Sequence, residues 1–113
     1  DQPNRRWVAD ISYVWTLEGW LYVAAVLDLF SRRIVGLAMK DRMTDHLVIE
    51  ALEQALIHRR PSGDLVHHSD RGSQYTSQNF HKLLDQYHIT ASMSGTGNCY
   101  DNAAMESFFH TLK

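Results

Sequence analysis

The sequence predicts an α/β domain built on a five-stranded mixed sheet, three antiparallel strands followed by two parallel ones, with helices on both faces. Three observations predict this class. Residues 7–39 fall into strand-length segments that are apolar or alternate between apolar and polar residues. Two later segments carry apolar residues at the 3.6-residue period of a helix, and short apolar strands separate the helical segments. No linker or repeat divides the chain, so one domain over residues 1–113 is expected.

The first three elements are predicted to be antiparallel strands joined by tight turns. Residues 7–14 alternate with the period of two that a strand shows, and Leu17-Glu18-Gly19 is a turn signal. Residues 20–27 are apolar on both faces, which predicts a central strand covered on both sides. Residues 33–39 predict a third strand, in which Gly36 marks a bulge or a close approach of another backbone.

The first predicted helix begins at a cap, Thr44 or Asp45, and ends before the breaker Pro61-Ser62-Gly63. Arg59-Arg60 complement the carbonyl end of its dipole, which explains these arginines without DNA. The helix has one apolar stripe that is expected to be buried. This stripe consists of Leu47, Val48, Ala51, Leu52, Ala55 and Leu56.

A short buried strand, Leu65-Val66, then leads into the acidic turn at Asp70. The second helix is expected to be capped near Thr76 or Ser77, and a strand over residues 89–93 follows it. The buried stripe of that helix consists of Phe80, Leu83, Leu84 and Tyr87. A glycine-containing loop then leads to a third helix, whose buried face is marked by Met105, Phe108, Phe109 and Leu112.

Composition excludes several classes of protein. The longest apolar run, residues 21–27, is far shorter than the roughly 20 residues that a membrane helix needs. The single Cys99 excludes an internal disulfide, and the first residues show no secretion signal, so an intracellular protein is the default expectation. The net charge of −2 is unlike that of a stand-alone DNA-binding protein. A divalent-metal site can neutralise phosphates locally, however, so net charge does not decide whether the partner is a nucleic acid.

Three carboxylates stand in comparable settings on three predicted elements. Asp10 lies within the first strand, Asp70 at the end of a buried strand and Glu106 within the last helix. Such hard oxygen ligands suit Mg²⁺ or Mn²⁺, and two such ions about 3.5–4 Å apart can carry an in-line phosphoryl transfer. Among 13 acidic residues, spacing alone leaves structural alternatives open, an edge-strand Asp10 facing water and a turn-capping Asp70. Asp28 is a fourth candidate, for which turn capping is the favoured role.

The sequence around these acids is more specific than their spacing. The relevant motifs are WVADISY (7–13), LYV with VLDLFSR (21–32), HSDRGSQY (68–75), GNCYDNA (97–103) and ESFF (106–109). Together they closely resemble the catalytic core of bacterial insertion-sequence transposases of the integrase-like, Asp-Asp-Glu type, which are related to retroviral integrases. Thirty-five residues separate Asp70 from Glu106, the spacing shared by that family and the retroviral integrases. The chain is therefore expected to be an integrase-like core and a fragment of a longer transposase.

The resemblance implies a ribonuclease H-like fold and a set of site residues. Asp10 resembles the carboxylate shared between two metal ions, Mg²⁺ or Mn²⁺, and Asp70 and Glu106 resemble the ligands that each complete one site; all three are the expected catalytic residues. Asn102 and Lys113 match positions that contact DNA in the family and its integrase relatives. Tyr100 and Gln74 are weaker candidates for such contacts.

The function that this resemblance implies is polynucleotidyl transfer. The transposase would cut DNA at the element ends and join the 3′ hydroxyl to target DNA, acting as a homo-oligomer on double-stranded DNA in the bacterial cytoplasm, at the nucleoid. Two alternatives stay open. One is a non-catalytic core that holds a transposase assembly together, and the other is a ribonuclease H-type nuclease that cuts RNA in hybrids.

Overall fold

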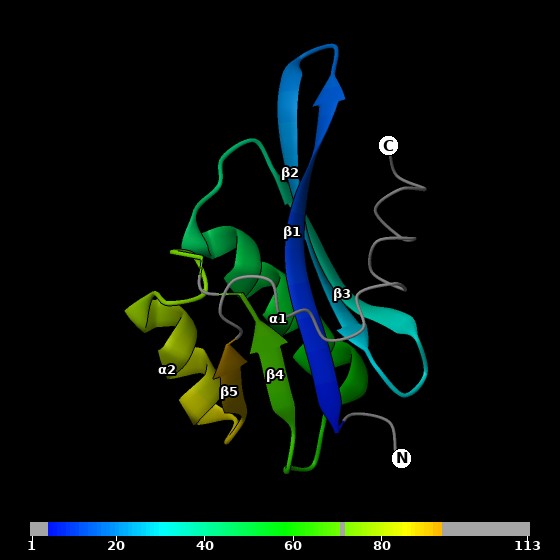
Figure 1. Cartoon of the computed structure of the whole chain (residues 1–113), viewed down its shortest axis with the longest axis vertical. Helices are drawn as coiled ribbons and strands as arrows, with labels where there is room; N and C mark the ends of the chain where they lie inside the picture. The colour runs from blue at the N-terminus through cyan, green and yellow to red at the C-terminus, as the bar shows by residue number, and fades with distance from the viewer. Residues whose placement is uncertain (1–4, 71, 94–113) are drawn as a thin grey trace.

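The computed structural model describes residues 5–70 and 72–93 (Figure 1). Its elements, in chain order, are β1 (Arg6–Thr16), β2 (Gly19–Asp28), β3 (Arg33–Lys40), α1 (Asp45–Arg59), β4 (Val66–Ser69), α2 (Gln78–Gln86) and β5 (Thr90–Met93). Every strand and helix expected before residue 94 is present, and their bounds differ by a few residues from the expected ones. The helix expected around Glu106 lies outside the described residues.

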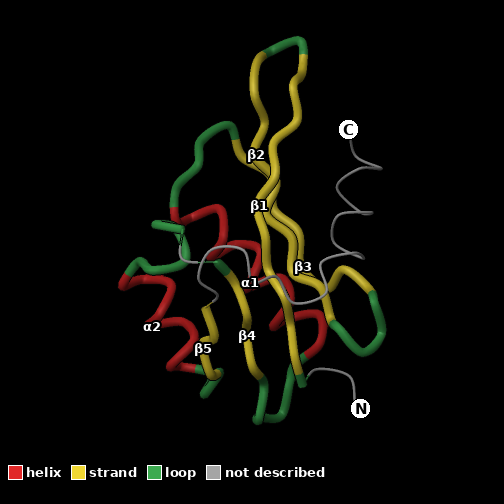
Figure 2. The backbone as a smooth tube through the Cα atoms, in the orientation of Figure 1, coloured by secondary structure: helices red, strands yellow, loops and turns green. Residues whose placement is uncertain are grey.

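The five strands form one mixed sheet in the order β3-β2-β1-β4-β5 (Figure 2). β2 is antiparallel to both β1 and β3, whereas β4 pairs parallel with β1 and β5 pairs parallel with β4. This arrangement confirms the predicted sheet of three antiparallel and two parallel strands. β2 lies between two strands, as its apolar character on both faces predicted.

The main core lies on one face of the sheet, where α1 and α2 pack together. The α1 residues in this core are the six that the helical period predicted. The core combines Trp7, Ala9, Ala24, Val26, Val35 and Ala38 from the antiparallel strands with Phe80 and Leu84 from α2. A second buried cluster, Val8, Val23, Ala25 and Leu27, lies on the opposite face. Both described helices cover the first face, so the expectation of helices on both faces is met for one face within the described residues.

Gly36 lies where β3 and α1 touch. The pairing of β2 with β3 shifts between Val26 and Leu27, which face Gly36 and Ile34, so that one extra residue bulges from β3. A Cβ atom on Gly36 would overlap the Ala51 carbonyl oxygen and lie 2.9 Å from the Ala55 Cβ atom. Both readings of Gly36 are therefore confirmed, because it lies beside a bulge and at a close backbone approach.

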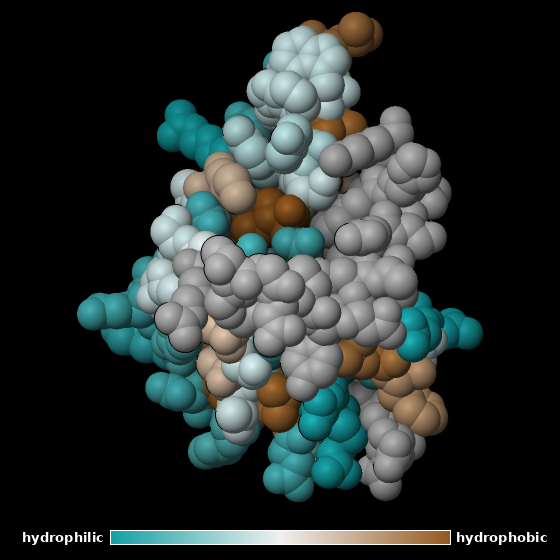
Figure 3. Space-filling model, viewed as in Figure 1, coloured by the Kyte–Doolittle hydropathy of each residue, from teal (hydrophilic) through white to brown (hydrophobic). Residues whose placement is uncertain are grey.

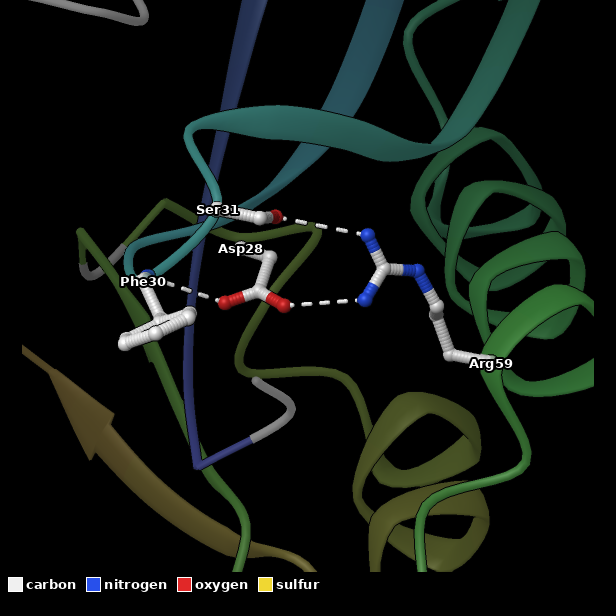
Figure 4. Close-up of polar contacts among 4 residues, drawn as sticks. All are labelled: Asp28, Phe30, Ser31 and Arg59. Atoms are coloured by element: carbon white, nitrogen blue, oxygen red, sulfur yellow. Dashed lines mark hydrogen bonds and ion pairs between the residues drawn. The ribbon is translucent and has the colours of Figure 1, made fainter. Parts of the chain in front are cut away.

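A buried ion pair fixes the turn after β2 to the end of α1 (Figure 4). The Asp28 side chain is fully buried, and its Oδ2 atom lies 3.1 Å from Nη1 of Arg59. Its Oδ1 atom accepts a hydrogen bond of 3.0 Å from the Phe30 N–H, and the Arg59 guanidinium also donates to Ser31 Oγ. The turn-capping role expected for Asp28 is confirmed. The ion pair with Arg59 was not predicted, because the helix dipole alone explained that arginine.

The helix ends agree with the sequence in part. Ser77 caps α2, because its hydroxyl accepts the Phe80 N–H at 3.1 Å. Thr44 stands at the N-cap position of α1, but its side chain makes no capping hydrogen bond, so the expected side-chain cap is wrong there. α1 ends with Arg60 in the left-handed region, whose N–H donates to the Leu56 carbonyl.

The hairpin of β1 and β2 extends past the strands that flank it. β3 pairs with β2 only as far as Tyr22, and the paired residues of β1 and β4 end at Val8 and His68. The projecting part carries aromatic residues opposite one another on one face, with ring pairs at 5.0 Å, and exposes Leu17 at its turn. These aromatic residues are Tyr13, Trp15, Trp20 and Tyr22. In Figure 3 this end is pale and brown, the colours of weakly polar and hydrophobic residues.

No helix within the described residues is long and apolar enough to cross a membrane.

Candidate metal centre

Asp10 and Asp70, which we call the acid pair, lie in the middle of β1 and just past the end of β4, two neighbouring strands. Val8 of β1 is the register partner of His68 of β4, and the two strands run parallel. Asp10 and Asp70 each follow these partners by two residues, so the two strands bring them to equivalent heights at the carboxyl end of β4. Functional groups of open α/β sheets gather at this end of parallel strands. The structure therefore brings together two of the three predicted ligands.

Local hydrogen bonds orient both carboxylates. Asp10 is partly buried, and its Oδ1 atom accepts the Ile11 N–H at 2.9 Å. Asp70 is exposed just past the end of β4, and its Oδ1 atom accepts the Gly72 N–H at 2.8 Å. The Asp70 hydrogen bond is the turn capping that the structural alternative expected, whereas Asp10 is partly buried and does not face open water.

Gly72 allows the turn after Asp70 to close tightly. A Cβ atom at Gly72 would lie 3.0 Å from Oδ1 of Asp70 and 3.3 Å from Oε1 of Gln74. The Gly72 carbonyl accepts the N–H groups of Tyr75 and Thr76 at 3.0 and 3.2 Å. The glycine thus connects the Asp70 carboxylate to the start of the following segment through backbone hydrogen bonds alone.

Tyr75, in the same turn, was not among the predicted site residues. Its side chain is 2% exposed and packs edge-on against Phe80, with the ring centroids 5.5 Å apart. Its hydroxyl has no hydrogen-bond partner among the described residues, which costs roughly 1–3 kcal/mol for a buried polar group. Burial raises the pKa of Tyr75 well above its usual value, and the negative charges of Asp10 and Asp70 raise it further. The hydroxyl is therefore protonated at physiological pH.

The donor set at this edge fits a divalent cation that prefers oxygen. The two carboxylates of the acid pair supply hard ligands for such a cation. Within residues 5–70 and 72–93, no three His, Cys, Asp or Glu side chains gather as a metal site. Glu106, the third ligand that the resemblance implies, lies outside the described residues.

The other predicted site residues fall into two groups. Glu106, Asn102, Tyr100 and Lys113 lie outside the described residues. Gln74 is described, and its Nε2 atom donates to the Met43 carbonyl at 3.4 Å, which links the Asp70 turn to the segment before α1. This hydrogen bond gives Gln74 a structural role, because it holds the Asp70 turn against the loop before α1. Its contact with DNA stays a prediction.

His67 lies behind the site, in the main core. It is 2% exposed and packs edge-on against Phe80, at a centroid distance of 5.3 Å. Burial lowers the pKa of His67 to about 4, and the charges of His68 and His81 add smaller downward effects. His67 is therefore neutral at physiological pH.

We expect the free energy of unfolding to fall by roughly 3 kcal/mol as the pH is lowered from 6.5 to about 4. Above pH 6.5, His67 is neutral in both states and contributes no pH dependence. Between these values the unfolded chain binds a proton that the folded chain rejects, so protonation favours unfolding. Urea unfolding at a series of pH values measures this effect. His67→Phe should flatten the profile and the exposed control His58→Gln should not; an unchanged slope in His67→Phe would contradict the assignment.

The sheet order and the acid pair define a ribonuclease H-like domain of the integrase type. The model of the integrase core domain family matches residues 1–99. The chain therefore belongs to the integrase core domain family.

The relatives of this chain are proteins of insertion elements. It is 52% identical to the insertion element IS600 uncharacterized 31 kDa protein of Shigella sonnei, over 98% of this chain and 41% of the relative. It is 48% identical to the transposase InsF for insertion sequence IS3A of Escherichia coli strain K12, over 98% of this chain and 38% of the relative. The chain thus spans about two fifths of the length of these curated relatives.

Solved structures share the fold at lower sequence identity. The HTLV-2 integrase catalytic core domain in complex with magnesium, in its trimeric form, matches with a TM-score of 0.79 at 22% identity, covering 96% of this chain and 66% of that one. The simian T-cell lymphotropic virus intasome in complex with the PP2A regulatory subunit B56 gamma contains a chain that matches with a TM-score of 0.82 at 22% identity, covering 97% of this chain and 38% of that one. These similarities confirm the predicted ribonuclease H-like fold.

Proposed function

We propose that this domain is the catalytic core of a DNA transposase that performs polynucleotidyl transfer at the ends of an insertion element. The observation that carries the proposal is the placement of Asp10 and Asp70 at equivalent heights on neighbouring parallel strands. Membership of the integrase core domain family and the insertion-element relatives support it. The acid pair, with Glu106 as the third ligand, would hold two Mg²⁺ or Mn²⁺ ions.

The residues of this chain have distinct tasks in that reaction. When bound, the metal ions activate an attacking oxygen and stabilise the leaving one in an in-line displacement. Asp10 pairs with Ala25 of β2, two residues past the last β1 residue that pairs with β4, so β2 supports the backbone that carries its carboxylate. Asp70 is oriented through the N–H of Gly72, which limits its rotation at the sheet edge. The attacking group would be water in the cutting step and a DNA 3′ hydroxyl in the joining step.

The proposed partners follow from the same function. They are double-stranded DNA, as element end and as target, and further copies of the protein in a homo-oligomer in the bacterial cytoplasm. Asn102, Tyr100, Lys113 and Gln74 are the proposed DNA contacts. Of the two alternatives, a non-catalytic assembly core does not require the acids to converge, and a ribonuclease H-type nuclease would show itself by cutting an RNA–DNA hybrid.

A titration with Mn²⁺ tests the proposal, combined with cleavage and joining of labelled duplexes that carry the element ends. Asp10→Asn and Asp70→Asn are each expected to weaken Mn²⁺ binding at least a hundredfold and to abolish both reactions, because each removes a charged ligand. Asp64→Asn is the matched control, since Asp64 is exposed and its left-handed backbone suits asparagine. Equal Mn²⁺ affinity in all three variants, with the fold intact by circular dichroism, would refute the metal-dependent reaction. Faster cleavage of a hybrid than of duplex DNA would favour the nuclease.

A further inference from the structure

Three arginines line one pocket where β1 and β4 begin, which we call the arginine pocket. They are Arg5, Arg6 and Arg32, all exposed, and the pocket has a volume of about 750 Å³. Among the described lining residues the only acidic side chain is Asp64, so three guanidinium groups stand against one carboxylate. A guanidinium presents its N–H donors in a planar fork that matches a phosphate group. The arginine pocket therefore favours a ligand that carries phosphate.

Backbone hydrogen bonds hold the walls of the arginine pocket. The Leu29 N–H donates to the Arg6 carbonyl at 3.0 Å, which joins the turn after β2 to the start of β1. The Arg32 N–H donates to the Asp28 carbonyl at 2.8 Å, within the turn that the buried ion pair fixes. Arg32 has a φ of 61°, in the left-handed region that residues other than glycine rarely adopt. The surrounding turn thus keeps Arg32 in a fixed backbone conformation, and the pocket is formed before a ligand binds.

Phe30 adds an exposed aromatic ring to the lining of the arginine pocket. It is 54% exposed, and Figure 4 shows its ring turned away from the ion pair of Asp28 and Arg59. Proteins hold unpaired nucleotides with this combination, because a base stacks on the ring and the phosphates meet the basic side chains. The pocket volume lies in the range of pockets that enclose ligands much larger than a phosphate ion. The lining therefore favours an unpaired nucleotide over inorganic phosphate.

The arginine pocket lies on the same face of the sheet as Asp10. Alternation along β1 places Arg6 and Asp10 on the face of Val8, and Leu29 packs against the buried cluster of that face. Arg6 and Asp10 are four residues apart, about 13 Å along β1, which one DNA strand covers in roughly four nucleotides. A smaller hollow of about 230 Å³ shares Arg6 and Leu29 with the pocket and reaches His68, two residues before the second acid of the pair. Concave surface thus extends from the arginine pocket toward the acid pair.

We propose that the arginine pocket binds unpaired nucleotides of a DNA strand, with the phosphates on its three arginines and a base stacked on Phe30. The choice of DNA as the nucleic acid rests on the proposed function. The same strand continues along the face of the sheet toward the acid pair, so the protein holds it at two points. The arginine pocket thereby helps to determine which phosphodiester lies at the acid pair.

Substitution of the arginines tests the proposal through the anisotropy of a short labelled oligothymidylate bound to the whole chain. The measurement is made in EDTA, so that divalent cations at the acid pair contribute nothing. Arg5→Gln and Arg32→Gln should each weaken binding about tenfold, because each removes charged hydrogen bonds to phosphate. Each should also lower the slope of log affinity against log salt by about 0.7. Arg33→Gln is the matched control, since Arg33 is exposed and adjacent to Arg32 but does not line the pocket, and it should change neither value.

Phe30→Leu tests the stacking part of the proposal, because leucine is apolar but has no flat ring. It should weaken binding of the oligothymidylate about fivefold or more and leave the salt slope unchanged, since stacking involves no phosphate. Tyr87→Leu is the control, because Tyr87 is a similarly exposed aromatic residue outside the pocket. Far-ultraviolet circular dichroism checks the fold of each variant. Arg5 and Arg32 lie in different segments, so one arginine variant suffices if the other does not fold.

The outcomes for the arginine pocket and for the proposed function are separate. Affinity within twofold of the unchanged chain in both arginine variants, or no binding by the unchanged chain, would overturn the pocket. Loss of Mn²⁺ binding in Asp10→Asn would still support the metal centre. Displacement of the strand by an equal concentration of inorganic phosphate, or tighter binding of an RNA strand than of DNA, would also overturn the proposed ligand. Weakened DNA binding in the arginine variants, with unchanged Mn²⁺ binding in Asp10→Asn, would support the pocket and count against the metal centre.

Discussion

Arg59→Met should lower the free energy of unfolding by about 3–5 kcal/mol, because it removes the guanidinium that pairs with the buried Asp28 carboxylate. The Asp28 side chain is fully buried and that of Arg59 is 20% exposed, so water can replace little of the lost interaction. Methionine keeps much of the apolar stem of arginine, which confines the change mainly to the guanidinium. Urea unfolding followed by circular dichroism measures the difference.

Arg33→Met is the control for the Arg59 experiment, because Arg33 is an exposed arginine on the neighbouring strand β3. It should change the free energy of unfolding by less than about 0.5 kcal/mol. Adding Asp28→Asn to Arg59→Met should recover part of the loss, since the amide oxygen can still accept the Phe30 N–H without a buried charge. A loss for Arg59→Met no larger than that of Arg33→Met would contradict a stabilising role for the pair.

Gly36→Ala is expected to cost more than about 3 kcal/mol, above the usual range for overpacking. The added methyl group would overlap the Ala51 carbonyl oxygen, which belongs to the backbone of α1 and cannot rotate away. β3 and α1 would have to separate along their contact, opening part of the main core. Denaturant unfolding measures the loss, and the far-ultraviolet circular dichroism spectrum shows whether the helix stays formed.

A second substitution separates the two contacts at Gly36. Ala55→Gly in the Gly36→Ala background removes the Cβ atom that lies 2.9 Å from the new methyl group but leaves the carbonyl overlap. Only a minor recovery is therefore expected. Full recovery would show that the side-chain contact, rather than the helix backbone, limits how closely β3 approaches α1.

The sheet could be predicted from sequence because its signals are local. Alternation in residues 7–14, the apolar run at 20–27 and the helical stripe after Thr44 each reflect burial of one segment. The acid pair was predictable for a related reason: Asp10 lies within a strand and Asp70 follows another, and the element order predicts that these two strands are neighbours. Both carboxylates lie where that order predicts.

What the sequence could not predict depends on contacts between distant segments. Asp28 and Arg59 are 31 residues apart, and each had a sufficient local explanation, turn capping or helix dipole, so neither indicated the other. Tyr75 was visible in the motif HSDRGSQY, but its unsatisfied hydroxyl appears only once the ring is packed against Phe80. Thr44 shows the opposite case. It occupies the predicted N-cap position of α1, but its side chain makes no capping hydrogen bond.

The projecting hairpin gives the domain two classes of tryptophan fluorophore. Trp7 is fully buried in the main core, whereas Trp15 and Trp20 are 64% and 49% exposed and contact each other edge-on. A water-soluble quencher should therefore dim the hairpin emission at concentrations that leave the core emission bright. A further increase in quenching of the hairpin emission early in a denaturant series would report fraying of the hairpin, and a later loss of protection of Trp7 would report opening of the sheet. The order of these two signals shows whether the hairpin and the sheet unfold as one unit.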